Sequence, residues 1–168
     1  MEIIICKTAD AAEKLAARMI ADAINAKPEF KLGLATGATM ENVYAELSKL
    51  NKEGKVDFSQ VRSWNLDEYA GLAPEHDQSY RYYMNKHLFN NVNIDIRNTH
   101  LPDGLADDEE FEAARYDESI DEAGGIDLWL VGIGCSGHVG FNDPGTSFQQ
   151  LLHHNNIILL FLHRLLQP

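Results

Sequence analysis

The stretch IDLWLVGIG, residues 126–134, is apolar apart from Asp127 and two glycines. A short, nearly continuous apolar run is typical of a strand that helices cover on both faces, as in parallel sheets. A glycine-rich loop, GCSGHVGFNDPG at 134–145, follows directly. We therefore expect residues 126–134 to form a central strand, with this loop at its carboxyl end.

The rest of the chain alternates between short apolar runs and segments with the apolar spacing of a helix. Further strands are predicted at residues 3–5, 31–35, 61–66 and, in a short form, 99–101. Helices are predicted after Thr8 or Asp10, from Met40 to Leu50, over 79–92 and over 107–123. This alternation predicts an α/β fold, a Rossmann-like three-layer parallel sheet with helices on both faces. Ligands bind such sheets at the carboxyl ends of the strands.

The chain has 168 residues and a formal net charge of -12, with 45% hydrophobic and 24% charged residues. This length and composition predict one globular domain with an apolar core. An acidic surface repels phosphate backbones, so neither nucleic acid nor an anionic membrane is expected as a partner. A phosphate ligand would need a local site made of oriented N–H groups or a few basic side chains.

The cysteines and the first residues predict a cytoplasmic location. Cys6 and Cys135 form no CxxC pair and make no disulfide framework. The segment MEIIICKTADAAEK at 1–14 lacks the basic and long apolar regions of a signal peptide. No apolar stretch has the length that crosses a bilayer.

The first candidate site is the segment Thr36-Gly37-Ala38-Thr39, between a predicted strand and a predicted helix. Gly37 lets the backbone approach a ligand closely, and the N–H groups at a helix start attract anions. The other interpretation is that Gly37 forms a tight turn and Thr39 caps the helix. The segment is short and matches no fixed nucleotide-binding signature.

The second candidate site is the pair of carboxylates Asp67 and Glu68 at the end of the strand predicted at 61–66. Their side chains point in different directions, so one is available as a base in the crevice while the other anchors a loop. A carboxylate held close to a carbon next to a carbonyl can remove its proton. The other interpretation is a strand-end aspartate that caps the next turn.

The third candidate site is the loop after residues 126–134. Its glycines would place His138 in the crevice, with Asp143 able to orient the ring, and such a pair suits acid/base chemistry on a sugar ring. A nucleophilic pair of Cys135 and His138 is the competing interpretation, although nothing else in the loop indicates acyl transfer. His153 and His154 are adjacent and have no Cys or acidic residue nearby, so no metal site is expected.

Three motifs resemble the glucosamine-6-phosphate deaminases, in the same order and at similar spacing: LGLATGAT at 32–39, WNLDEYAGL at 64–72 and VGIGCSGHVGFNDPGTSF at 131–148. The stretch EHDQSYRYYMNKHLF at 75–89 also resembles the helix after that family's DEY motif. The resemblance covers residues 1–148 and implies conversion of glucosamine 6-phosphate and water to fructose 6-phosphate and ammonia. It implies a sugar phosphate as ligand and no nicotinamide, pyridoxal phosphate or metal cofactor.

By residue match, the resemblance implies that Asp67 is the base for the C2 proton and that His138 assists ring opening. Asp143 stands where the family has Glu as the partner of that histidine, and Ser136 stands where it has Asp or Asn. Residues 36–39 match the segment that approaches the phosphate. Ser136 lacks the carboxylate or amide, and Asp143 is one methylene shorter than Glu, so both departures are expected to weaken catalysis.

The tail QQLLHHNNIILLFLHRLLQP at 149–168 does not match the family, and it contains no Asp or Glu and a single Arg. Family members continue past this point with further strands and with basic residues that clamp the phosphate. We therefore expect a truncated deaminase-like α/β domain at 1–148, incomplete at its C-terminal end. The tail is interpreted as an aberrant continuation, from a shifted reading frame or a mis-joined exon, and little activity is expected.

Two other functions fit parts of the pattern. A 6-phosphogluconolactonase shares the related fold but hydrolyses an ester, and an Arg would be expected after its strand-end Asp-Glu pair, where this chain has Tyr69. A non-catalytic sugar-phosphate-binding domain, or an inactive fragment, would lack turnover. Association into a homo-oligomer is a further prediction.

Overall fold

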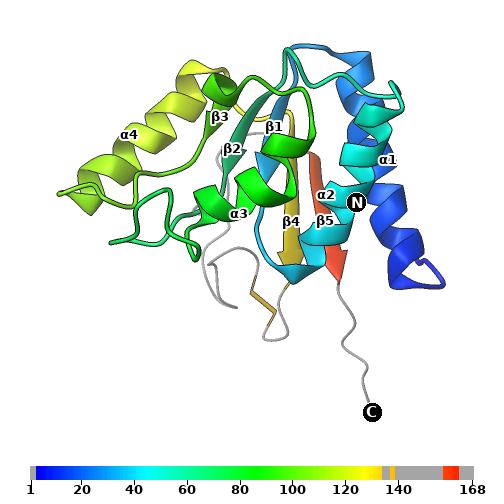
Figure 1. Ribbon diagram of the computed structural model, residues 1–168, viewed down its shortest axis with the longest axis horizontal. Helices are drawn as coiled ribbons and strands as arrows, with labels where there is room; N and C mark the ends of the chain where they lie inside the picture. The colour runs from blue at the N-terminus through cyan, green and yellow to red at the C-terminus, as the bar shows by residue number, and fades with distance from the viewer. Residues whose placement is uncertain (1–2, 134–136, 139–156, 163–168) are drawn as a thin grey trace.

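The computed structural model describes residues 3–133, 137–138 and 157–162 (Figure 1). Its strands form one parallel sheet in the order β3-β2-β1-β4-β5. They are β1 (Lys31–Leu34), β2 (Arg62–Asn65), β3 (Thr99–His100), β4 (Leu128–Ile133) and β5 (Ile157–Leu162). The α/β parallel sheet predicted from the sequence is confirmed.

The helices connect these strands. They are α1 (Ala9–Ala26), α2 (Ala38–Lys52), α3 (Tyr80–His87) and α4 (Glu109–Glu122), with 3-10 turns η1 (Phe89–Asn91) and η2 (Ile96–Asn98). Thr8, Ser79 and Asp108 start α1, α3 and α4, because each side chain accepts a hydrogen bond from an N–H of the first turn. No helix in the described ranges has the length and apolar character needed to cross a membrane.

The strand β4 is the central, doubly covered strand that the sequence predicts. Its residues Leu128 to Val131 are at most 4% exposed. Leu128 and Leu130 join the larger core with α1 and α2, whereas Trp129 and Val131 join a smaller core with Tyr116 of α4. Successive side chains of a strand point to opposite faces, so helices cover both sides of the sheet, as Figure 1 shows.

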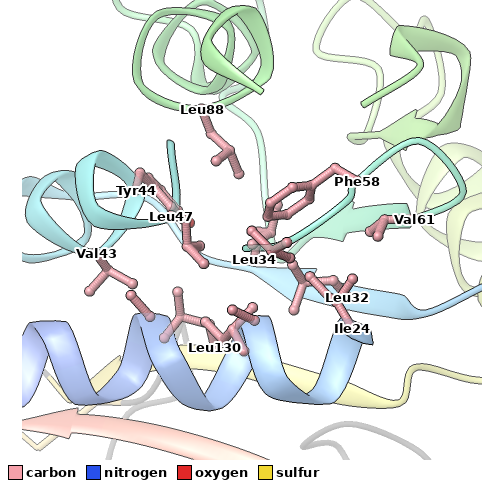
Figure 2. Close-up of a cluster of buried hydrophobic side chains, with 14 of the residues drawn as sticks. Ile24, Leu32, Leu34, Val43, Tyr44, Leu47, Phe58, Val61, Leu88 and Leu130 are labelled. Atoms are coloured by element: carbon pink, nitrogen blue, oxygen red, sulfur yellow. The ribbon is translucent and has the colours of Figure 1, made fainter. Parts of the chain in front are cut away.

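The larger core also fixes α3 beside the end of β1. Figure 2 shows Leu88, the residue after α3, pointing toward the buried side chains around Leu34 and Phe58. Leu34 is the last residue of β1, and both leucines are at most 1% exposed. This packing places α3 next to the loop that leaves β1.

Two predicted elements differ from the structure. Residues 3–5 form no strand, and Ile3 and Ile5 are 74% and 92% exposed. The prediction of a strand there was wrong, because an apolar run becomes a strand only where a neighbour takes its backbone hydrogen bonds. The helix predicted over 79–92 ends at His87, since Leu88 leaves the helical region at φ -133° and a 3-10 turn follows.

Part of the tail joins the sheet. The strand β5 pairs in parallel with β4, from Leu128 with Ile157 to Ile133 with Leu162. Backbone pairing uses N–H and C=O groups that every residue but proline supplies, and β-branched and aromatic residues favour it. An apolar segment can therefore occupy the edge beside β4 although its sequence does not match the family pattern.

Candidate active site

The predicted site segments follow three neighbouring strands. The strands β2, β1 and β4 lie side by side and parallel, so their carboxyl ends lie along one edge of the sheet. Residues 36–39 follow β1, Asp67 follows β2 and His138 follows β4. The topology therefore brings segments that are distant in sequence to a single edge, where ligands bind α/β sheets.

The loop after β1 depends on Gly37. This residue is the N-cap of α2 with φ +114°, a conformation that side chains rarely adopt, and it contributes no side-chain cap. The first amide N–H groups of α2 therefore have no acceptor within the helix or from a capping side chain. Thr39 lies inside the first turn, so the interpretation that Thr39 caps the helix was wrong.

The two carboxylates after β2 have different surroundings. Glu68 accepts hydrogen bonds from the backbone N–H groups of Tyr69 at 2.9 Å, Tyr80 at 2.7 Å and Arg81 at 2.9 Å. It therefore anchors the loop and the start of α3, where a negative charge also favours the helix dipole. Its oxygens are occupied by these donors, which leaves Asp67 as the carboxylate of this pair that can act as a base.

Asp67 is half-buried and has an unusual acidity. Burial raises the pKa of its carboxyl from 3.8 to about 6, and the nearby charge of Glu68 adds to the shift. A carboxyl with this pKa is still ionised at neutral pH, yet it holds a proton more strongly than an exposed aspartate. These are the properties that a general base needs.

Tyr80 connects the loops after β1 and β2. Its hydroxyl lies 3.2 Å from that of Tyr69, and the two rings are 4.7 Å apart. Thr36 and Asp67 are both close enough to the Tyr80 hydroxyl to influence its pKa. One phenol therefore lies near both the predicted anion loop and the predicted base.

The loop after β4 is described only at two positions. Gly137 has φ +84°, and His138 is half-buried. Cys135, Ser136 and Asp143 lie outside the described residues, so the predicted pairing of His138 stays a prediction, as does the competing nucleophile. His153 and His154 are also outside them. Within the described ranges, no three His, Cys, Asp or Glu side chains gather as a metal site would require.

A hollow of about 270 Å³ is lined by residues of the loop after β2, the loop after β3 and helix α4. Its acidic lining residues are Glu68, Asp103, Glu109, Glu112 and Asp117. None of the described residues that line it is basic. A phosphate is repelled by such a lining, which leaves the start of α2 as the better anion site.

The order of these segments along the chain agrees with a known family. The family model of glucosamine-6-phosphate isomerases/6-phosphogluconolactonase matches residues 6–146. The chain belongs to this family.

Two curated relatives of this chain are glucosamine-6-phosphate deaminases. The glucosamine-6-phosphate deaminase of Clostridium perfringens strain 13 is 50% identical over 153 residues, which are 91% of this chain and 63% of the relative. Glucosamine-6-phosphate deaminase 1 of Giardia intestinalis is 52% identical over 142 residues, 84% of this chain and 53% of the relative. The chain thus spans less than two thirds of the length of these relatives.

Solved structures of proteins of this family superpose on the chain. A monomeric glucosamine-6-phosphate deaminase superposes with a TM-score of 0.86 and 42% identity, covering 89% of this chain and 62% of that one. The 6-phosphogluconolactonase of Thermotoga maritima superposes with a TM-score of 0.67 and 23% identity, covering 83% and 62%. At that identity the lactonase shows the shared fold alone.

Sequence reasoning missed the part that α3 plays in this family member. Residues 79–92 were predicted only as a helix, whereas the hydroxyls of Tyr80 and Tyr83 both make hydrogen bonds. Tyr83 donates to the carbonyl oxygen of Gly37 at 2.8 Å. The sequence did contain a signal for this role, namely tyrosine where phenylalanine would also suit a helix. A buried phenol usually finds a hydrogen-bond partner, so these tyrosines indicated contacts with nearby polar loops.

Proposed function

We propose that this chain carries active-site residues of a glucosamine-6-phosphate deaminase, which converts glucosamine 6-phosphate and water to fructose 6-phosphate and ammonia. The observation that carries the proposal is a half-buried Asp67, with its pKa raised to about 6, after a strand that pairs with β1, from which the chain leads into the uncapped start of α2. About half of the matched residues are identical to those of curated deaminases. A 6-phosphogluconolactonase is the alternative, supported by the shared family model and by fold similarity.

Asp67 is the proposed base for the C2 proton of the open-chain aldose. Removing this proton gives an enolamine, and returning a proton to C1 gives an imine at C2. Water then adds to the imine carbon and ammonia leaves, which gives the ketose. Asp67 suits this step because burial makes it a stronger base than an exposed carboxylate. Glu68 is engaged by three backbone N–H groups instead.

The remaining roles rest on the family match. We assign ring opening to His138, with Asp143 as its partner and Ser136 nearby in the same loop. We assign the phosphate to Thr36, Gly37, Ala38 and Thr39, where the first N–H groups of α2 lack a side-chain cap. No step of this mechanism uses a cofactor or a metal ion.

We expect slow turnover from the 168-residue chain. A helix start contributes roughly 0.3–1 kcal/mol toward an anion, and about 2 kcal/mol in a favourable partly buried geometry. The net charge of -12 opposes that attraction at long range. The experiment therefore includes a longer chain, in which residues 149–168 are replaced by the corresponding continuation of the Clostridium perfringens relative.

The deciding assay offers glucosamine 6-phosphate and 6-phosphogluconolactone to both chains and measures ammonia and acid release. We expect ammonia from glucosamine 6-phosphate, more from the longer chain, and no acid above the spontaneous rate. Acid release from the lactone without ammonia would instead establish the lactonase. Binding of fructose 6-phosphate without turnover in either chain would point to a binding domain.

Three further predictions are part of this proposal. We place the end of the family-type domain at residue 148, which the family match ending at residue 146 supports. A cytoplasmic location follows from the metabolic role of the relatives. Homo-oligomer formation is the least supported, since the solved deaminase with the TM-score of 0.86 is a monomer, and sedimentation of the purified chain decides it.

A further inference from the structure

One helix is bonded to both loops of the site. At its start, Glu68 accepts the N–H groups of Tyr80 and Arg81 at 2.7 and 2.9 Å. The Tyr80 hydroxyl lies close enough to the Thr36 side chain for that side chain to influence its pKa. One turn later, the Tyr83 hydroxyl donates to the carbonyl oxygen of Gly37 at 2.8 Å. The loop of the base and the loop of the anion are thus both attached to α3.

The contact between Tyr83 and the Gly37 carbonyl affects how this loop can bind an anion. A loop binds an anion with its N–H groups, so its carbonyl oxygens must point elsewhere. The carbonyl of Gly37 accepts from the N–H of Met40 at 2.9 Å and from Tyr83, which occupies both of its lone pairs. The carbonyl of Ala35 is held in the same manner by the hydroxyl of Tyr44.

Tyr83 is fixed by its own neighbours. Its ring packs against His87, with centroids 4.5 Å apart, and meets the edge of Tyr44 at 6.5 Å. Burial raises the pKa of Tyr83 well above its ordinary value, so the hydroxyl stays a neutral donor at any physiological pH. The donor is therefore preorganised and does not depend on ionisation.

We infer that Tyr83 is a positioning residue for anion binding, whose hydroxyl holds the Gly37 carbonyl so that the N–H groups at 38–39 stay available. The inference rests on the proposed function, in which this loop receives a sugar phosphate. It adds a residue on α3 that does not touch the ligand and acts through Gly37.

The test compares Tyr83→Phe with Tyr82→Phe in the full 168-residue chain. Both changes remove one phenol oxygen from α3, but Tyr82 is 41% exposed and serves as the control. We expect Tyr83→Phe to speed amide hydrogen exchange at Met40, whose N–H donates to the Gly37 carbonyl, by about 2- to 10-fold, the range for losing one hydrogen bond. Exchange elsewhere and the melting temperature should stay close to those of the parent. The dissociation constant for fructose 6-phosphate should rise by a similar factor.

The outcomes separate the two proposals. Unchanged exchange at Met40 in Tyr83→Phe would overturn the positioning role, whatever the chain binds. Faster amide exchange with an unchanged dissociation constant for fructose 6-phosphate would show that the order of the loop does not govern binding. This outcome would also overturn the positioning role of Tyr83. A parent chain that binds no fructose 6-phosphate would overturn the proposed function, and with it the link from loop order to the ligand. A matching effect in Tyr82→Phe would mean that the response is not specific to the Gly37 contact.

Discussion

Asp67 combines two properties that conflict in a folded protein. It is half-buried, which disfavours its charged form, and its proposed role requires that charge. The folded-state pKa of about 6 lies above the ordinary 3.8, so the folded protein binds the proton more tightly than the unfolded chain. The free energy of unfolding should therefore fall as pH rises from about 4 to about 6, and this loss persists at neutral pH.

Asp67→Asn should separate stability from activity. The amide keeps the shape of the side chain and removes its charge, so the free energy of unfolding at pH 7 should rise by about 1–2 kcal/mol. The gain should shrink toward pH 4, where the folded parent carries a protonated Asp67. Turnover in the longer chain should fall by about 10²- to 10⁴-fold. Urea unfolding at both pH values and an ammonia assay provide the measurements.

The parent enzyme should show the matching pH dependence. Because Asp67 is the proposed base, kcat/KM should rise with pH through about 6 and then level off. Continued exchange of the C2 hydrogen with solvent at near-parent rate in Asp67→Asn would place the base elsewhere. If the free energy of unfolding of Asp67→Asn at pH 7 were lower than that of the parent, the buried charge of Asp67 would not destabilise the protein as its raised pKa indicates.

At the scale of elements, α3 depends on Glu68. Glu68→Ala removes the acceptor of three backbone N–H groups, and we expect it to destabilise the protein by about 2 kcal/mol. It also removes a nearby negative charge, so the pKa of Asp67 should fall while burial keeps it above the ordinary value. The rising limb of the pH profile should shift to lower pH.

Glu75→Ala is the matched control, because Glu75 is an exposed carboxylate of the same loop. Its unfolding free energy and pH profile should equal those of the parent. If both variants behave alike, Glu68 does not anchor α3 as its hydrogen bonds indicate.

The pairing of β1 with β4 depends on a glycine. A Cβ at Gly33 would lie 2.0 Å from a ring atom of Trp129, which is 3% exposed and has no room to move. We expect Gly33→Ala to cost about 3 kcal/mol or more, at the upper end of overpacking. Among the described residues, a Cβ at Gly132 would meet the flexible end of Met40 at 3.3 Å, so Gly132→Ala should cost less than about 1 kcal/mol. Equal thermal shifts for the two variants would contradict this packing.

For the whole molecule, charge decides how a sugar phosphate approaches. The net charge of -12 repels a dianion over a distance that shrinks from about 30 Å at 0.01 M salt to about 8 Å at 0.15 M. Fructose 6-phosphate should therefore bind the 168-residue chain a few-fold more tightly as sodium chloride rises over this range. Calorimetric titration measures this, with neutral fructose as the control. Weaker binding at higher salt would show that local positive groups outweigh the net charge.

The sequence by itself determined the fold class and indicated the segments of the candidate site. The apolar run at 126–134 became β4 because a strand without polar faces is stable only under helices on both sides. Glycine and acidic residues directly after predicted strands indicated residues 36–39 and Asp67, because the carboxyl ends of parallel strands lie at one edge of the sheet.

Only the tertiary structure decided how those segments work together. Residues 3–5 have a strand-like sequence but no strand, since pairing depends on a neighbour that periodicity does not specify. Asp67 and Glu68 are adjacent carboxylates, and their roles separate because the start of α3 meets Glu68 alone. The contact of Tyr83 with Gly37 joins residues 46 positions apart, and it exists because core packing at Leu34 and Leu88 sets α3 beside the end of β1.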